Sequence, residues 1–167
     1  ANRLVGSEMC IRDSLNIVMK NILIVGTGTI GEPLIGLLAQ HKEKLGIDNI
    51  SFFKRTPLSD EKGKVEALIR KGAKLVATSE AKNDFESMGF DVEDLEKSYE
   101  ENQVIIDCTP SGNKNWDEIY SNLDKDKRFL AQGSEHGFGP FFAWGINNNV
   151  LANDQNKYLI ASCNTHN

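Results

Sequence analysis

Short apolar runs alternate along the chain with longer polar stretches in which apolar residues recur at helical spacing. Several of the short runs consist of consecutive Val, Ile and Leu, which is typical of strands covered on both faces. Strands that alternate with helices in this way predict an α/β fold with a doubly wound, mainly parallel sheet. The expected strands are residues 21–25, 50–53, 74–77, 104–107, 128–131 and 158–162. The expected helices are residues 30–45, 61–71, 82–88 with 92–98, and 114–121.

Two segments depart from this pattern. Residues 132–156 are rich in Gly, Phe and Asn, and we expect connecting loops there with at most a short helix. Residues 1–18 show no strand alternation and no full amphipathic turn, and the charges of Glu8, Arg12 and Asp13 interrupt any secretory pattern. Residues 5–14 also resemble translated sequencing-adapter read-through. We therefore expect residues 1–18 to be a non-native or disordered extension, with the natural start at Met19.

Composition narrows the class of protein. The 167 residues are 40% hydrophobic, which suits one packed domain. With 19 Lys and Arg against 24 Asp and Glu, a nucleic-acid partner is not expected, and no apolar run approaches the ~20 residues of a membrane span. Three scattered cysteines indicate a reducing compartment, so we expect a cytoplasmic protein. Because His41 and His136 lack partners at metal-ligand spacing, no metal site is expected.

A glycine motif lies between the first expected strand and the first expected helix. Residues 26–31 read Gly-Thr-Gly-Thr-Ile-Gly and fit the G-x-G-x-x-G pattern of dinucleotide-binding turns. Gly26 would permit the tight turn, Gly28 the approach of a pyrophosphate, and Gly31 close packing of helix on strand. The free amides and the positive end of the helix dipole would face the phosphates, and Thr29 with Glu32 would form a capping box. The motif predicts a Rossmann-type dinucleotide-binding domain.

The end of the second expected strand bears on the choice of dinucleotide. NAD-preferring sites usually place an Asp or Glu there to accept hydrogen bonds from the ribose hydroxyls. This chain has Lys54, Arg55 and Thr56 instead, and we expect no carboxylate there to repel a phosphate. Two cations and a hydroxyl suit a 2′-phosphate, so NADP is favoured over NAD, with use of both left open. A solvated basic loop without a ligand is the alternative.

The fourth and fifth expected strands end on the same edge of the predicted sheet. Small residues, Thr109 and Pro110 among them, follow the fourth strand, and Gly133 follows the fifth. In a doubly wound sheet, ligands bind outside the carboxyl ends of the strands, so these residues are candidates for cofactor contacts. Cys108 lies at the same edge, and we interpret it as a small buried hydrophobe rather than as a reactive thiol.

Cys163 is the candidate nucleophile. It follows the last expected strand and opens what would be a helix, where the helix dipole can stabilise a thiolate. A thiolate at such a position suits attack on an aldehyde carbonyl. On spacing alone, a structural cysteine is an equal alternative.

Four segments together give the chain a resemblance to the archaeal-type (type II) glyceraldehyde-3-phosphate dehydrogenases. The Ser-Cys-Asn-Thr sequence at residues 162–165 resembles the nucleophile motif of that family. The other segments are residues 26–31, 54–57 and 132–135. The resemblance runs from Met19 to the end, and it covers the family's nucleotide-binding half and the first residues of its catalytic half. It implies an NAD(P)-binding domain at 19–161 and the start of a truncated catalytic domain at 162–167.

The resemblance implies phosphorylating oxidation of an aldehyde. Cys163 would add to glyceraldehyde 3-phosphate as a thiohemiacetal, NADP or NAD would take the hydride, and inorganic phosphate would release 1,3-bisphosphoglycerate from the resulting thioester. By the family pattern, Thr29 and Ile30 contact the cofactor, Gly133 lies beside it, and Ser162 and Asn164 flank the substrate. The family's catalytic domain also supplies the general base and most of a homotetramer interface. We therefore expect this polypeptide to be inactive alone.

Two other functions fit the same residues. The first is a related semialdehyde dehydrogenase, with the same thiol chemistry on a different acyl group. The second is a regulatory module that binds NADP and performs no chemistry. Activity of a completed chain on each aldehyde separates the enzymes, and a Cys163→Ser variant separates either enzyme from the regulatory module.

Overall fold

A single parallel sheet organises the described part of the chain. The computed structural model describes residues 21–132, 136–152 and 155–161. Within them, eight strands lie in the order β4-β3-β2-β1-β5-β6-β8-β7, and every neighbouring pair is parallel. The strands are β1 (Asn21–Val25), β2 (Asn49–Phe53), β3 (Lys74–Ala77), β4 (Val92–Asp94), β5 (Val104–Asp107), β6 (Arg128–Gln132), β7 (Phe141–Phe142) and β8 (Lys157–Ile160). The predicted parallel α/β architecture is confirmed.

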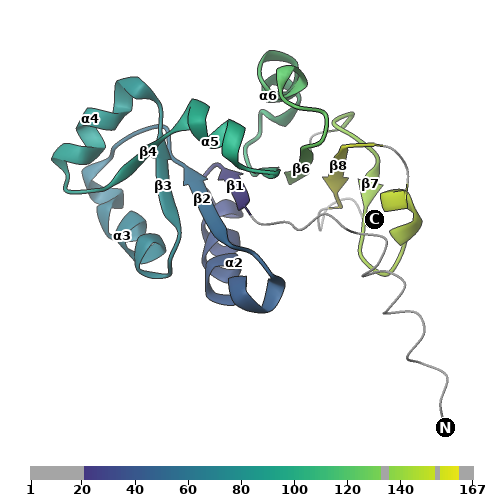
Figure 1. The fold of residues 1–167 in the computed structure, drawn as a ribbon, viewed down its shortest axis with the longest axis horizontal. Helices are drawn as coiled ribbons and strands as arrows, with labels where there is room; N and C mark the ends of the chain where they lie inside the picture. Colours follow the sequence, from purple (N-terminus) through teal and green to yellow (C-terminus); the bar gives the residue numbers. More distant parts are fainter. Residues whose placement is uncertain (1–20, 133–135, 153–154, 162–167) are drawn as a thin grey trace, which may run out of the picture.

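Helices cover both faces of this sheet. The α-helices are α2 (Gly31–Leu45), α3 (Lys62–Arg70), α4 (Ser79–Ser87), α5 (Leu95–Glu101) and α6 (Gly112–Glu118). Short 3-10 turns are η1 (Ser59–Glu61), η2 (Tyr120–Asn122) and η3 (Asn148–Ala152). Figure 1 shows α2 and α5 on opposite sides of the strands.

Strand β1 is apolar at successive positions because both of its faces are buried. Ile22 and Ile24 belong to a core cluster that includes side chains of α2, α3 and α4. Leu23 and Val25 belong to a second cluster, which includes side chains of α5 and η2. A strand between two layers of helices must present apolar side chains in both directions, which explains the continuous apolar run in the sequence.

The strand order reverses direction at β1. The chain proceeds from β1 to β2, β3 and β4 on one side, and then returns to place β5 on the other side of β1. The register brings Val25 level with Phe53 of β2 and with Asp107 of β5. The carboxyl ends of the three strands therefore meet at one edge, at the switch point where doubly wound sheets form their ligand crevice.

The prediction of a helix at 92–98 is wrong at its start. Residues Val92–Asp94 form β4, which extends the sheet by pairing Val92 with Leu75 of β3. Helix α5 begins only at Leu95, because the Asp94 carboxylate accepts hydrogen bonds from the amides of Glu96 and Lys97 and caps it. A strand this short carries no readable alternation, and its apolar residue fits a helical pattern equally well.

The segment 132–156 contains one element that was not predicted from the sequence. Strand β7 (Phe141–Phe142) pairs with β8 at the edge of the sheet, whereas η3 is the short helix that was expected. Gly139 permits this pairing, because a Cβ atom there would lie 2.6 Å from the Lys157 carbonyl oxygen. Strand β8 ends at Ile160, so Ser162 of the expected last strand lies outside the described residues. In the described ranges, no helix has the length and apolar character needed to cross a membrane.

Candidate functional site

A cleft of about 690 Å³ opens at the carboxyl edge of β1, β2 and β5. Its volume lies within the range usual for cofactor pockets. The cleft brings together six of the residues that the sequence pattern proposed for cofactor binding, from three loops far apart in the chain. These are Gly26, Lys54, Arg55, Thr56, Thr109 and Pro110.

The glycine turn forms one wall of the cleft and depends on two close contacts. Gly26 has a φ of 99°, in the left-handed region that other residues rarely adopt. A Cβ atom at Gly26 would also lie 2.9 Å from the Thr109 methyl carbon. A Cβ atom at Gly31 would overlap with the Gly26 carbonyl oxygen. These contacts seat the start of α2 on the turn and the turn on the loop after β5, as the motif predicts.

Gly28 faces open space instead. It is exposed, and a Cβ atom there would have no protein atom outside the adjacent residues within 4 Å. Thr29 and Ile30 are exposed at the same corner of the molecule. The predicted capping box is wrong, since Ile30 occupies the N-cap position of α2 without a side-chain hydrogen bond. Backbone bonds close the first turn, with the Glu32 amide donating to the Gly28 carbonyl oxygen at 3.0 Å.

A carboxylate lies where none was expected from the sequence. Glu61, at the end of η1, forms an ion pair and hydrogen bond with the Lys54 ammonium group. The Lys54 side chain is only 8% exposed and that of Glu61 is 29% exposed, so water screens the pair only in part. The hydrogen bond and charge of Lys54 lower the pKa of Glu61 below its ordinary value. The expectation that Lys54 has no carboxylate neighbour is therefore wrong, because the turn before α3 folds Glu61 back onto it.

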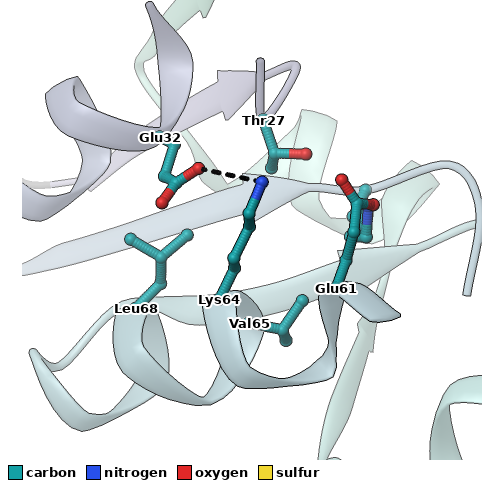
Figure 2. Close-up of a pocket in the computed structure, with 7 residues that line it drawn as sticks. Thr27, Glu32, Glu61, Lys64, Val65 and Leu68 are labelled. Atoms are coloured by element: carbon teal, nitrogen blue, oxygen red, sulfur yellow. Dashed lines mark hydrogen bonds and ion pairs between the residues drawn. The ribbon is translucent and has the colours of Figure 1, made fainter. Parts of the chain in front are cut away.

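A second ion pair stands beside the first. Lys64 of α3 lies 3.9 Å from the Glu32 carboxylate of α2, and both side chains are largely exposed. Figure 2 shows Glu32 and Lys64 pointing toward each other next to Thr27 of the glycine turn, with Glu61 on the far side of Lys64. Thr27, Glu32, Lys54, Glu61 and Lys64 line one small pocket. Within this small pocket, two cations and two carboxylates therefore balance.

The opposite wall is organised by Asp107, the last residue of β5. The residue is 1% exposed, and its carboxylate accepts hydrogen bonds from the Thr109 amide at 2.8 Å and the Thr109 hydroxyl at 2.6 Å. Asn115 of α6 donates to it at 2.7 Å, and the Tyr120 hydroxyl of η2 donates at 2.8 Å. Four donors offset the cost of burying one carboxylate. They also fix the loop of Thr109 and Pro110 against the cleft.

Three ionisable side chains near Asp107 have raised pKa values. Burial and the Asp107 charge raise the pKa of the Cys108 thiol to about 12 and that of Tyr99 to about 12. Burial likewise raises the pKa of Tyr120 above its ordinary value. At neutral pH these groups remain protonated, so Cys108 lacks the thiolate that nucleophilic chemistry requires. Cys108 is half-buried rather than buried as predicted, and it packs against the core cluster that includes side chains of α2.

The structure does not bring every proposed residue to the cleft. Gly28, Thr29 and Ile30 lie at the start of α2 rather than in the lining, and Gly31 is buried against Gly26. Gly133, Ser162, Cys163 and Asn164 lie outside the described residues. Their predicted roles stay predictions. Within the described ranges, no group of three or more His, Cys, Asp and Glu side chains is placed to hold a metal ion.

Three residues of this site were not predicted from the sequence. Glu61 gave no signal, because it stands seven positions after Lys54 in a predicted helix and its role depends on the turn between them. Asp107 gave a local signal that could have been used: an Asp two residues before a Thr is a frequent side-chain-to-backbone turn. Asn115 reaches the site from α6 and could be found only from the tertiary structure.

Comparison with known proteins gives a fold and no family. No family model matches the chain, and no curated protein matches it. Glucose dehydrogenase from Haloferax mediterranei, solved with NADP, Zn and gluconolactone, is similar with a TM-score of 0.52 and 16% identity. A second structure of glucose dehydrogenase from that organism is similar with a TM-score of 0.53 and 15% identity. The fold is of the Rossmann type.

The similarities cover nearly all of this chain but a smaller share of the solved chains. Each glucose dehydrogenase match covers 95% of this chain but only 40% of the solved chain. Shikimate dehydrogenase from Aquifex aeolicus is matched over 94% of this chain and 64% of its own, with 18% identity and a TM-score of 0.36. The chain thus spans less than half the length of the glucose dehydrogenases. The feature shared with the glucose dehydrogenases is the parallel α/β architecture.

Proposed function

We propose that the cleft between β1, β2 and β5 binds a nicotinamide dinucleotide, NADP or NAD, for a dehydrogenase. One observation carries the proposal: the glycine turn, the end of β2 and the loop after β5 line a single cleft at the switch point of the sheet. This is the position at which doubly wound sheets hold dinucleotides, with the pyrophosphate at the helix N-terminus. The NADP in one of the similar glucose dehydrogenase structures supports the same assignment.

The residues fit such a ligand. The absence of a side chain at Gly28 leaves the backbone at the start of α2 open to a phosphate group. Lys54, Arg55 and Thr56 offer charge and a hydroxyl at the end of the cleft where the adenosine ribose would lie. Thr109 and Pro110 present a fixed surface beside the glycine turn, on the side of the cleft away from β2, where the nicotinamide would lie. When bound, a nicotinamide accepts or donates a hydride.

The finer proposal concerns the reaction. On the resemblance of residues 162–165 to the type II nucleophile motif, Cys163 is the nucleophile that adds to the carbonyl of glyceraldehyde 3-phosphate, with Ser162 and Asn164 beside the substrate. The resulting thiohemiacetal would pass its hydride to a bound nicotinamide and become a thioester on Cys163. Inorganic phosphate would then take the acyl group as an acyl phosphate and release the Cys163 thiolate, so the whole reaction is phosphorylating oxidation. In a protein that has this activity, Cys163→Ser should abolish the activity and leave the affinity for the dinucleotide unchanged. A regulatory module would keep its function in that variant.

Dinucleotide binding is tested with a variant that blocks the cleft without disturbing the fold. A Gly28→Val side chain projects into open space, so the protein should fold as well as the unmodified chain. It would occupy the place of the pyrophosphate, and we expect the affinity for NADPH and NADH to fall at least about tenfold. Nucleotide fluorescence titration measures the affinity, and thermal unfolding checks the fold.

Gly63→Val is the matched control. Gly63 lies on α3 and does not line the cleft, and a Cβ atom there would likewise have no atom of another element within 4 Å. The control should bind both nucleotides as the unmodified chain does. Equal binding by all three proteins would refute a pyrophosphate at Gly28, and no binding by any of them would refute the dinucleotide site.

A further inference from the structure

Lys54, one of the two cations that suit a 2′-phosphate by sequence, is already paired. Lys54 and Glu61 form the least exposed of the ion pairs between described side chains, and both residues line the dinucleotide cleft. The pair carries no net charge. Lys54 therefore meets an incoming ligand as half of a neutral unit and not as an isolated cation.

The Glu61 carboxylate lies where an acidic side chain favours NAD over NADP. An acidic side chain at the end of the second strand accepts hydrogen bonds from ribose hydroxyls and repels a 2′-phosphate. Glu61 is remote from that position in the sequence, yet the structure sets its carboxylate on Lys54 at the end of β2. Glu32 lines the adjoining small pocket, where its carboxylate is paired with Lys64.

Building on the proposed dinucleotide site, we propose that Glu61 is the residue that sets cofactor preference, by occupying Lys54 and opposing a 2′-phosphate. In the unmodified protein, a phosphate can approach Lys54 only if it displaces or tolerates the Glu61 carboxylate. A ribose hydroxyl meets no such opposition, because it can donate to that carboxylate. The protein should accordingly discriminate weakly between the two cofactors. Removing the Glu61 charge should convert it to a protein that prefers the phosphorylated cofactor.

A purely structural role for the pair leads to a different expectation. Glu61 precedes α3 and Lys54 follows β2, so the pair also joins these two elements. If joining them were its only role, loss of the Glu61 charge would affect phosphorylated and unphosphorylated ligands alike. The ratio of the two affinities therefore separates cofactor selection from structural support.

The test compares two probes that differ in the 2′-phosphate. We would titrate the full chain and its Glu61→Gln variant with adenosine 2′,5′-bisphosphate and with adenosine 5′-monophosphate by calorimetry. The glutamine keeps an oxygen that can accept the Lys54 hydrogen bond, so the fold should be retained. We expect the affinity ratio to move about tenfold toward the bisphosphate, the size of one partly buried charge interaction with a phosphate. An unchanged ratio, or a shift toward the monophosphate, would overturn the proposal.

Glu93→Gln is the matched control. Glu93 pairs with Lys74 at 2.8 Å between two neighbouring strands, as a carboxylate–lysine bridge that does not line the cleft. Its loss should leave the affinity ratio unchanged, and an equal shift there would overturn the local explanation. If neither probe binds the unmodified protein, the proposed dinucleotide site fails. If both bind and Glu61→Gln leaves the ratio unchanged, only the role of Glu61 fails.

A second variant keeps the proposal testable if Glu61→Gln does not fold. Glu32 is largely exposed and its ion pair with Lys64 is long, so Glu32→Gln should fold normally. Because Glu32 faces the same pocket, its loss should shift the ratio in the same direction by a smaller factor, about threefold. A shift toward the monophosphate in this variant would contradict the charge mechanism.

Discussion

The two walls of the cleft are built on opposite principles. On the β5 side, Asp107 is 1% exposed and its carboxylate is held by four hydrogen bonds, so the loop after β5 has one arrangement. On the β2 side, Glu61 is 29% exposed and holds a single partner, Lys54. A buried and fully satisfied network fixes a position, whereas a partly exposed ion pair can exchange one partner for another. We therefore expect changes to the first wall to alter stability and changes to the second to alter ligand choice.

The largest effect is expected at Asp107. In an Asp107→Asn variant, the new NH2 group is itself a donor and cannot accept the hydrogen bonds that one carboxylate oxygen accepts. At least one buried donor around position 107 would therefore lose its acceptor. We expect the free energy of unfolding to fall by about 3 kcal/mol or more, measured by urea denaturation. Asp124→Asn is the control, since Asp124 is exposed and accepts one bond from the Asp126 amide at 3.1 Å. Similar losses for the two variants would contradict a structural role specific to Asp107.

A smaller loss of stability is expected when a tyrosine hydroxyl that donates a hydrogen bond is removed, and its size should depend on whether the acceptor is charged. Tyr120 donates to the Asp107 carboxylate, whereas Tyr158 donates to the Gln155 carbonyl oxygen at 2.7 Å. Tyr120→Phe should lower the free energy of unfolding by about 2 kcal/mol and Tyr158→Phe by about 1 kcal/mol or less, because bonds to charged groups are stronger. Both phenylalanines keep the ring packing. Equal losses in urea denaturation would show that the Asp107 network has no special strength.

The smallest expected effect is a near-absence of reaction at Cys108. Burial and the Asp107 charge raise the pKa of its thiol to about 12, so at pH 8 the thiolate is a very small fraction. Iodoacetamide should therefore label Cys108 far more slowly in the native protein than in urea, as measured by peptide mass spectrometry. Equal rates in the two conditions would mean that the β5 wall opens readily.

The architecture could be predicted from the sequence because most of its strands follow the same hydrophobic pattern. Strands buried on both faces are apolar at consecutive positions, and β1, β2, β3, β5, β6 and β8 were all found from that pattern. Strands β4 and β7 were missed, since three and two residues are too few to show any period. The glycine turn could also be predicted from the sequence, because its backbone conformation requires glycines at closely spaced positions.

The charges of the cleft were harder to predict from the sequence. Lys54 was identified by its place after β2, but its partner comes from a later turn and is known only once the chain is folded. Asp107 likewise collects donors from α6 and η2 as well as from its own loop. Sequence position therefore indicated which residues reach the cleft, whereas their electrostatic state depended on tertiary contacts.

Amide chemical-shift mapping with NADP tests the switch-point cleft most directly as the dinucleotide site. We predict shifts concentrated at the glycine turn, at Arg55 and Thr56, and at Thr109, around the cleft of about 690 Å³. A second groove, of about 400 Å³, lies between α3 and the turn before β4 and includes Arg70 and Asp91. Shifts confined to that groove, or no shifts at millimolar NADP, would contradict the assignment of the switch-point cleft as the dinucleotide site.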